Sequence, residues 1–298
     1  MKPRRMWAIL TAVLLLASTA WAGSWTDALP PEDQVAEYLQ SISVTIKTPY
    51  AEGSGVVKTR EVDKRKINFV WTAAHVVDDL RQVKEVIDPK TGTKRQHVTF
   101  KDCQIVKELS EAGRRVGELK MDALVVRYSE EEDLALLRIR KTDFVDASVV
   151  FYLDEKIPPI GTDLYHVGSL LGQMGANSMT SGIVSQIGRT IDKSEYDQST
   201  CVAFPGSSGG GVYLENGAYV GMLVRGAGEG FNLSVPIRRL REWAADARVE
   251  WAVDDRVKAP TEEELEALPV EDSGVVFDDG DEKSLKEFPY LIRGRKPN

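Results

Sequence analysis

The chain has 298 residues, of which 42% are hydrophobic, so it can bury one sizeable core or two smaller ones, and this composition excludes a disordered or collagen-like protein. Acidic residues outnumber basic ones by 46 to 38, which gives a formal net charge of -8. Because binding to phosphate groups needs a basic face, nucleic acid is not an expected partner.

Residues 1–22 have the pattern of an export signal. Basic residues at positions 2, 4 and 5 precede an apolar run from Met6 to Leu16, and Ala20-Trp21-Ala22 supplies the small residues that a signal peptidase reads. The alternative is an uncleaved membrane anchor, but the apolar run is shorter than the ~20 residues that a span needs. We therefore predict cleavage after Ala22 and export of the mature chain, periplasmic or secreted, with no membrane span left in it.

Two cysteines, Cys103 and Cys201, remain in such an oxidising compartment. They can form one disulfide or stay as isolated buried thiols, and the sequence leaves both alternatives open. The chain has neither a CxxC motif nor a histidine-rich cluster, so neither a metal site nor another cofactor is expected.

Between about residues 41 and 237, short β-type runs alternate with turn residues, after a predicted helix over residues 31–42. Many short strands and few long segments with a 3.6-residue period favour antiparallel sandwiches or barrels over β-α-β units, so the predicted fold class is all-β. The predicted strands are SVTIKT (43–48), GSGVVKT (53–59), INFVWTAAHVV (67–77), HVTF (97–100), ALVVRY (123–128), LALLRI (134–139), DLYHVG (163–168), TSGIVSQIG (180–188), GVYLE (211–215), AYVGMLV (218–224) and FNLSVPI (231–237).

The C-terminal part of the chain differs from this β-rich core. The run VPIRRLREWAADAR from Val235 carries apolar residues at helical spacing and predicts a helix that closes the core. After about Glu250 acidic residues dominate, and we predict a short, partly disordered acidic tail over residues 250–298. A brief helix is expected within it at residues 261–268, where Thr261 and Glu264 have the spacing of a capping box.

Two adjacent serines, Ser207 and Ser208, lie in the glycine-rich stretch GSSGGG at residues 206–211. A serine hydroxyl becomes a nucleophile only with a base that accepts its proton and with donors that hold the oxyanion formed on the attacked carbonyl. His75 follows a strongly apolar strand and lies among small residues. Asp133 stands where the acidic run EEED ends and an apolar strand begins, which favours it as the orienting carboxylate, although Glu132 competes for this role. The other histidines, His97 and His166, are interpreted as structural or exposed.

Three short motifs carry a resemblance to a known family. TAAH (72–75), DLALL (133–137) and GSSGG (206–210) resemble the signatures of chymotrypsin-fold, trypsin-like serine proteases, in the family's order of His, Asp and Ser. GSGVV (53–57), TSGIVSQIGR (180–189) and FNLSVPI (231–237) are more similar to bacterial Deg/HtrA-type proteases. The resemblance covers about residues 44–243. It implies two six-stranded antiparallel β-barrels with a boundary near residue 150, in a protease domain over residues 23–249. Deg-type relatives often add a PDZ domain, but too few residues follow here, so none is expected.

The resemblance also implies a role for each residue of the catalytic site. Ser208 attacks the scissile carbonyl, His75 transfers protons and Asp133 stabilises the correct tautomer of the histidine. The backbone N–H groups of Gly206 and Ser208 form the oxyanion hole. Ser207 fills the position where digestive members carry an aspartate that pairs with a newly cut N-terminus, so activation by that ion pair is not expected.

The residues expected to bind the substrate lie on either side of this motif. The resemblance places the wall of the specificity pocket at Val202, Ala203 and Phe204 together with Val224, Arg225 and Gly226. Val202 offers no carboxylate to a Lys or Arg side chain, so a small or aliphatic residue is expected before the scissile bond. Arg225 leaves an acidic side chain open as an alternative. The backbone of residues 224–226 is expected to pair with the substrate as an added strand.

The sequence therefore predicts an exported serine endopeptidase that acts on polypeptides through an acyl-enzyme. The alternative is a catalytically silent peptide-binding module that keeps the fold and its cleft. A monomer and an oligomer are both compatible with the sequence.

Overall fold

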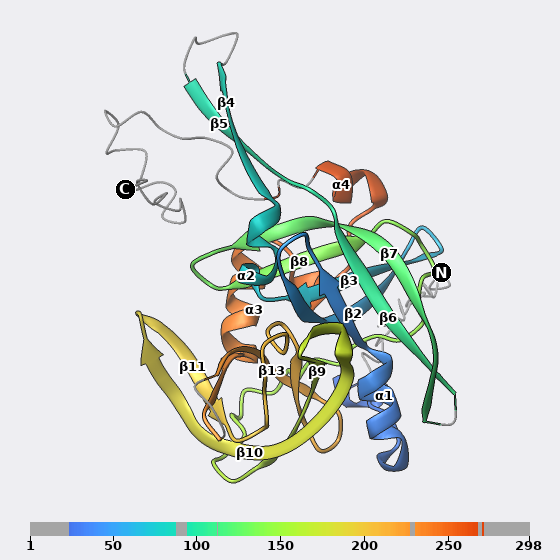
Figure 1. The fold of residues 1–298 in the computed structure, drawn as a ribbon, viewed down its shortest axis with the longest axis vertical. Coiled ribbons are helices and arrows are strands. Elements are labelled where there is room, and N and C mark those ends of the chain that lie inside the picture. The colour runs from blue at the N-terminus through green and yellow to red at the C-terminus, as the bar shows by residue number, and fades with distance from the viewer. Residues whose placement is uncertain (1–23, 88–93, 112, 227–229, 268–269, 271–298) are drawn as a thin grey trace, which may run out of the picture.

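The structure is a computed structural model that describes residues 24–87, 94–111, 113–226, 230–267 and 270, so the predicted signal at residues 1–22 lies outside the described residues. Two closed antiparallel barrels of six strands each make up most of it (Figure 1), which confirms the predicted fold class. Within the described residues, no helix is long and apolar enough to cross a membrane.

The first barrel carries the segment around His75, and the second carries the glycine-rich segment around Ser208. In order around the first barrel, the strands are β1 (Ser43–Lys47), β2 (Glu52–Val62), β3 (Arg65–Thr72), β8 (Leu134–Ile139), β7 (Arg114–Ser129) and β6 (Cys103–Glu111). Around the second barrel they are β10 (Gly175–Ile191), β11 (Ser194–Ser199), β14 (Asn232–Pro236), β13 (Tyr219–Gly226), β12 (Gly211–Leu214) and β9 (Asp163–Leu170).

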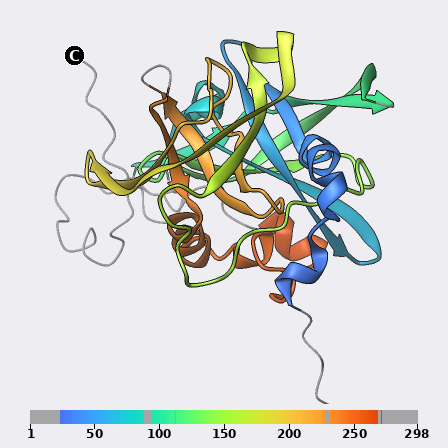
Figure 2. The same ribbon diagram turned by 90° about the horizontal axis from the view of Figure 1, so that it is seen from below.

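Short helices connect and cover the barrels. The view from below shows α3 and the segment after it next to each other along one edge of the molecule (Figure 2). The predicted N-terminal helix and the helix after Val235 are both present, as α1 and α3. The helical elements are η1 (Trp25–Ala28), η2 (Glu32–Gln34), α1 (Val35–Ser41), α2 (Ala74–Val77), η3 (Asp78–Leu80), η4 (Gly172–Met174), α3 (Ile237–Asp246), η5 (Glu250–Ala252) and α4 (Glu262–Ala267).

The structure contains strands beyond the predicted ones. β4 (Arg81–Ile87) and β5 (Lys94–Phe100) form a separate two-stranded ribbon that projects from the first barrel (Figure 1). Only HVTF at its end was predicted. β6 and β11 were also missed, because CQIVKELSE and SEYDQS contain many charged and polar residues and have few features of a buried strand.

A row of aromatic side chains joins the two barrels. Trp71, at the end of β3, makes edge contacts with Phe151 at 6.4 Å and with Trp243 of α3 at 5.7 Å between ring centroids. Phe151 in turn contacts Tyr219 of β13 at 4.9 Å, and Tyr219 contacts Tyr213 of β12 at 5.6 Å. Each such pair contributes about 0.5–1.5 kcal/mol beyond its buried area. Because Trp71 is followed closely by α2, this row holds α2 at the junction of the barrels.

The chain packs against the first barrel beyond residue 250, where the predicted acidic tail begins. Trp251 is buried and contacts Phe69 at 4.7 Å, and the Asp255 carboxylate accepts a 2.7 Å hydrogen bond from the buried Lys58 ammonium. The predicted capping box is confirmed, since the N–H of Thr261 donates to Glu264 Oε2 at 2.7 Å and the N–H of Glu264 donates to Thr261 Oγ1 at 3.3 Å. Residues 250–267 are therefore packed against the first barrel, and residues 271–298 lie outside the described residues.

Candidate active site

His75 and Asp133 meet at the edge of the first barrel. The ring nitrogen Nδ1 of His75 lies 2.9 and 3.0 Å from the two carboxylate oxygens of Asp133, and the His75 backbone N–H donates to Oδ1 at 3.1 Å. The carboxylate side chain is 14% exposed and the imidazole 47%. Two donors from one residue therefore fix the carboxylate, while the far side of the imidazole remains accessible.

The geometry also distinguishes the two competing acids. Asp133 directly precedes β8 and has a left-handed backbone with φ of 53°, which turns its side chain toward His75. The Glu132 carboxylate instead accepts a 2.6 Å hydrogen bond from Arg239 Nε of α3. Of these two acids, the structure places Asp133 on the histidine.

The two adjacent serines have different environments. Ser207 is fully buried, accepts the Phe204 N–H on its hydroxyl at 3.1 Å and donates its own N–H to Phe204 O at 2.9 Å, so it shapes the turn. Ser208 is partly exposed, and its hydroxyl donates to the carbonyl of Val224 at 3.4 Å. Among the described residues, the Ser208 hydroxyl has no hydrogen bond to His75. A rotation about the Ser208 side-chain bond would therefore have to precede proton transfer between them.

The segments that carry His75 and Ser208 approach each other closely at Gly53 of β2. A Cβ on Gly53 would lie 2.5 Å from Val76, the neighbour of His75, and 3.2 Å from the carbonyl of Ser208. The next residue, Ser54, donates its backbone N–H to that same carbonyl at 2.8 Å. The glycine therefore lets the first barrel touch both α2 and the Ser208 segment.

The backbone N–H groups of Gly206 and Ser208 are free to bind an anion. Gly206 has φ of 95°, and the carbonyl of Pro205 accepts the Leu171 N–H at 2.8 Å. Because the peptide bond is trans, this holds the Gly206 N–H pointing away from Leu171. Within the described part of the chain, neither this N–H nor that of Ser208 has an acceptor. Such an unpartnered pair is what an oxyanion hole requires.

A cavity of about 400 Å³ adjoins Ser208, and five of the six residues predicted to bind the substrate line it: Val202, Ala203, Phe204, Arg225 and Gly226. Val224 lines a neighbouring cavity of about 480 Å³ that includes His75 and Asp133. Arg225 lines both cavities, and its guanidinium lies 3.2 Å from Asp192 and 5.3 Å from the ring centroid of Tyr196. No carboxylate lines the cavity beside Ser208 among the residues that the structure describes.

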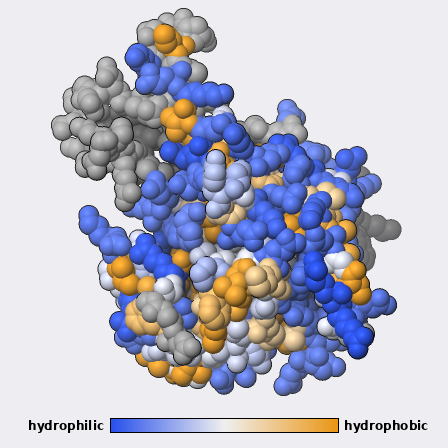
Figure 3. All heavy atoms as spheres, in the orientation of Figure 1, coloured by the Kyte–Doolittle hydropathy of each residue, from blue (hydrophilic) through white to orange (hydrophobic). Residues whose placement is uncertain are grey.

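The surface around this cavity is partly apolar. Phe204, which lines it, is 50% exposed, and Leu171, whose N–H is bonded to the Pro205 carbonyl, is 55% exposed. The space-filling view shows hydrophobic atoms gathered over the lower half of this face of the molecule (Figure 3). The site is therefore bordered by side chains that can contact apolar parts of an extended peptide.

Comparison with known proteins agrees with this geometry. The sequence matches the profile of the trypsin-like peptidase domain over residues 53–222. The chain belongs to this family. It is 32% identical over 115 residues to the serine protease Do-like HtrA of Lactococcus lactis subsp. cremoris (strain MG1363), and equally to that of subsp. lactis (strain IL1403). The match spans 36% of this chain and 28% of the length of either relative.

Solved structures show the same fold as this trypsin-like peptidase domain. The serine endoprotease from Yersinia pestis has a TM-score of 0.51 at 18% identity, covering 74% of this chain and 67% of that one. Deg5 has a TM-score of 0.52 at 20% identity, covering 76% and 99% of the two chains. At these identities the likeness establishes the fold.

Sequence reasoning missed two residues at the site of this peptidase domain, Pro205 and Asn232. Pro205 lines the cavity beside Ser208. Beneath Gly226, Asn232 donates through Nδ2 to the carbonyl of Cys201 at 2.5 Å, while its Oδ1 is buried and has no partner among the described residues. Their residue types carry no catalytic signal, and only strand register brings Asn232 opposite Gly226.

The cysteines and the other two histidines that the sequence analysis considered are either buried or lie outside the described residues of the peptidase domain. Cys103 and Cys201 are both free, so the disulfide alternative is wrong, and burial raises their thiol pKa values to about 12 and about 11. Burial lowers the pKa of His166 to about 4, so this histidine is neutral, and its Nδ1 lies 3.0 Å from Gly211 O. The His97 side chain lies outside the described residues. No cluster of metal-ligating side chains occurs in the described part of the chain.

Proposed function

We propose that this chain is a serine endopeptidase that hydrolyses peptide bonds through an acyl-enzyme. The observation that carries the proposal is the fixed contact between His75 Nδ1 and Asp133, combined with two unpartnered amides beside Ser208. Ser208 Oγ turns from Val224 O, attacks the substrate carbonyl and passes its proton to His75 Nε2. The N–H groups of Gly206 and Ser208 hold the oxyanion.

The second half of the reaction uses the same groups. The C–N bond of the tetrahedral intermediate breaks, and His75 gives its proton to the departing amine. Water then attacks the acyl-enzyme, again with His75 as base, and releases Ser208. The Asp133 carboxylate remains ionised throughout and stabilises the imidazolium.

The cavity beside Ser208 supports a small or aliphatic residue on the acyl side of the scissile bond. Its walls include Val202, Ala203, Phe204 and Leu223, and the Arg225 guanidinium at its edge is engaged by Asp192. A Lys or Arg side chain would enter such a cavity without a carboxylate partner, at a high desolvation cost. The basic-apolar-small pattern of residues 1–22 further supports export of the mature chain, with polypeptides outside the cytoplasm as substrates.

A nucleophile-directed probe tests the proposal. The purified protein and its Ser208→Ala variant would be treated with a fluorophosphonate and assayed on a peptide library. We expect labelling and cleavage for the wild type only, with the substitution costing about 10⁴ to 10⁶ in turnover. Equal labelling of both proteins would falsify the assignment, and the cleavage profile would reveal the preferred side chain in the cavity.

One observation favours the alternative of a silent peptide-binding module. The Ser208 hydroxyl is bonded to the Val224 carbonyl, and no hydrogen bond joins it to His75 in the described residues. If this arrangement persists when a peptide is bound, the protein will retain the peptide without cutting it. Tight binding of library peptides that stay intact after long incubation at pH 8 would support this second function.

A further inference from the structure

Arg239 is a nearly buried cation at the junction of the two barrels. It lies on α3, and its side chain is 10% exposed. Its guanidinium makes three short hydrogen bonds, from Nε to Glu132 Oε2 at 2.6 Å, from Nη2 to the Glu132 carbonyl at 2.7 Å and from Nη1 to the Glu195 carbonyl at 2.9 Å. It also lies 5.0 Å from the ring centroid of Tyr196. A planar, multidentate donor is therefore fixed in one orientation.

Two of these bonds reach the turn that supplies the orienting carboxylate. The Glu132 carbonyl belongs to the planar peptide unit that joins Glu132 to Asp133. The bond from Arg239 Nη2 therefore fixes the orientation of the peptide plane next to Asp133. Asp133 has a left-handed φ of 53°, a conformation that costs aspartate more than it costs glycine. The turn's own hydrogen bonds are longer, at 3.3 Å from Asp133 N to Glu130 O and 3.2 Å from Glu132 N to Ser129 Oγ. The charge-assisted hydrogen bonds from Arg239 to Glu132 are therefore shorter than the turn's own hydrogen bonds and hold it more firmly.

The other contacts of Arg239 belong to the second barrel. Glu195 and Tyr196 lie on β11, and α3 directly follows β14 of the same barrel. The guanidinium therefore connects the Asp133 turn of the first barrel to the barrel that carries Ser208. A shift of this turn would move the carboxylate away from His75.

We propose that Arg239 is a positioning residue that holds Asp133 against His75 Nδ1. The proposal concerns the same site as the proposed function and rests on it for its effect on turnover. The hydrogen bond between His75 and Asp133 is nevertheless a property of the folded protein, and it can be measured whether or not the protein turns over.

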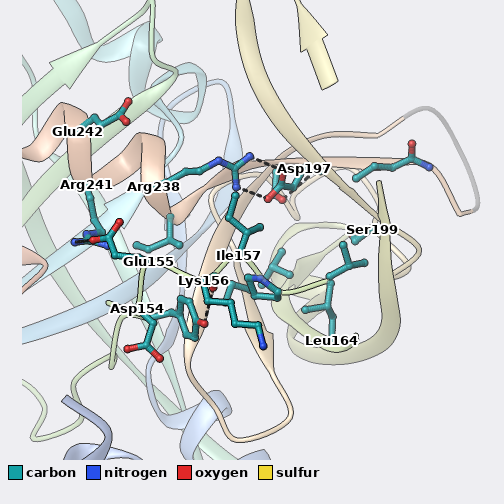
Figure 4. A pocket seen from close by; sticks show the side chains of 18 residues that line it. Asp154, Glu155, Lys156, Ile157, Leu164, Asp197, Ser199, Arg238, Arg241 and Glu242 are labelled. Atoms are coloured by element: carbon teal, nitrogen blue, oxygen red, sulfur yellow. Dashed lines mark hydrogen bonds and ion pairs between the residues drawn. The ribbon is translucent and has the colours of Figure 1, made fainter. Parts of the chain in front are cut away.

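The neighbouring Arg238 offers a matched control. It is also a paired arginine on α3, and it donates to Asp197 Oδ1 at 2.7 Å and Oδ2 at 2.8 Å, as the dashed lines in Figure 4 show. It lines a separate cavity of about 300 Å³ together with Ile157, Leu164 and Ser199. Among the described residues, Arg238 has no bond to the turn that carries Asp133. Arg238→Lys therefore removes a comparable arginine pairing without touching that turn.

The test compares Arg239→Lys with Arg238→Lys in the full chain. Lysine keeps the charge but cannot reproduce the planar, forked geometry of the guanidinium, so the Asp133 turn is released in the first variant only. We expect kcat to fall between about tenfold and a hundredfold in Arg239→Lys with KM little changed, because misplacement of a catalytic group by about 1 Å has effects of this size. The acid limb of the rate profile should also move to lower pH, since the imidazolium is less stabilised. Arg238→Lys should change neither.

The downfield proton signal of His75 Nδ1–H supplies the readout that does not depend on turnover. It should broaden or move upfield in Arg239→Lys and stay in place in Arg238→Lys. Glu132→Gln, at a partly exposed side chain, is a second variant in case Arg239→Lys fails to fold, and it should show the same change to a smaller extent. An unchanged His75 signal in a folded Arg239→Lys or Glu132→Gln protein overturns the proposal. An inactive wild type whose His75 signal responds as expected overturns the proposed function and supports the role of Arg239.

Discussion

Removal of one buried hydroxyl, in Ser54→Ala, should weaken both the fold and the oxyanion hole. Ser54 is fully buried in β2, donates its hydroxyl to the Gly206 carbonyl at 2.7 Å and accepts the Ser169 N–H at 2.7 Å. The substitution leaves both backbone groups without this partner, in a place that water does not reach. Each such group costs about 1–3 kcal/mol, so the free energy of unfolding should fall by roughly 2–6 kcal/mol.

The same substitution should reduce turnover by more than the loss of folded protein explains. With the Gly206 carbonyl released, the peptide unit between Gly206 and Ser207 can rotate. This loosens the turn that positions the Ser208 N–H, whereas the Gly206 N–H belongs to the peptide unit held by the Leu171 bond to Pro205 O. Loss of one oxyanion donor costs about 10²–10³ in kcat, and partial misalignment should cost at least about tenfold. Urea unfolding and active-site-titrated kcat would measure the two effects separately.

Ser110→Ala is the matched control, because Ser110 also lies on a strand of the first barrel but is exposed. It should change stability by less than about 0.5 kcal/mol and leave kcat unaltered. If Ser54→Ala is as stable and as active as Ser110→Ala, the two hydrogen bonds of Ser54 do not hold the Gly206 segment, and the reasoning fails.

Two further predictions concern buried ionisable groups. Burial lowers the pKa of His166 from 6.5 in the unfolded chain to about 4 in the folded protein. The neutral, buried imidazole therefore costs no stability above about pH 6.5, and the free energy of unfolding falls by up to about 3 kcal/mol as pH falls from about 6.5 to 4. Urea unfolding at a series of pH values should show a smaller decrease at acid pH in His166→Gln than in the wild type. Asp255→Asn removes the carboxylate partner of Lys58, whose side chain is 1% exposed. Because Asp255 is partly exposed to solvent, we expect the substitution to lower the free energy of unfolding by about 2 kcal/mol, less than the loss of a fully buried ion pair would. An unchanged midpoint of urea denaturation would contradict this prediction.

The catalytic candidates could be predicted because each belongs to a short local motif. TAAH places a histidine just after a buried strand, and DLALL places an aspartate just before one, so the ends of β3 and β8 carry these side chains to neighbouring positions. The strand pairing of Thr72 with Ala135 explains why they meet. Which serine is accessible and which acid faces the histidine also followed from the motifs, and the geometry agrees in both cases.

The supports of the site could not be predicted, because they depend on contacts between distant segments. Arg239 and Glu132 are 107 residues apart, and Ser54 and Gly206 are 152 apart. An arginine on an amphipathic helix and a serine in a strand are both ordinary surface residues by type, and only the packing of α3 and β2 makes them buried donors. Composition also gave no sign that the acidic run after residue 250 packs on the first barrel, which it does through Trp251 and Asp255.

The proposed catalytic chemistry depends on how firmly two separately closed barrels are held together. Each barrel is closed by its own strand pairing, so other contacts set the register between them. Besides the backbone bond from Ser54 N–H to Ser208 O, these contacts include the aromatic row through Trp71, the hydroxyl of Ser54 and the guanidinium of Arg239. The aromatic row is apolar and tolerates small shifts, whereas hydrogen bonds of 2.6–2.9 Å do not. The two polar contacts therefore set the distance between His75 and Ser208 more finely than the larger apolar contact does, and their loss should lower turnover by more than the loss of folded protein explains.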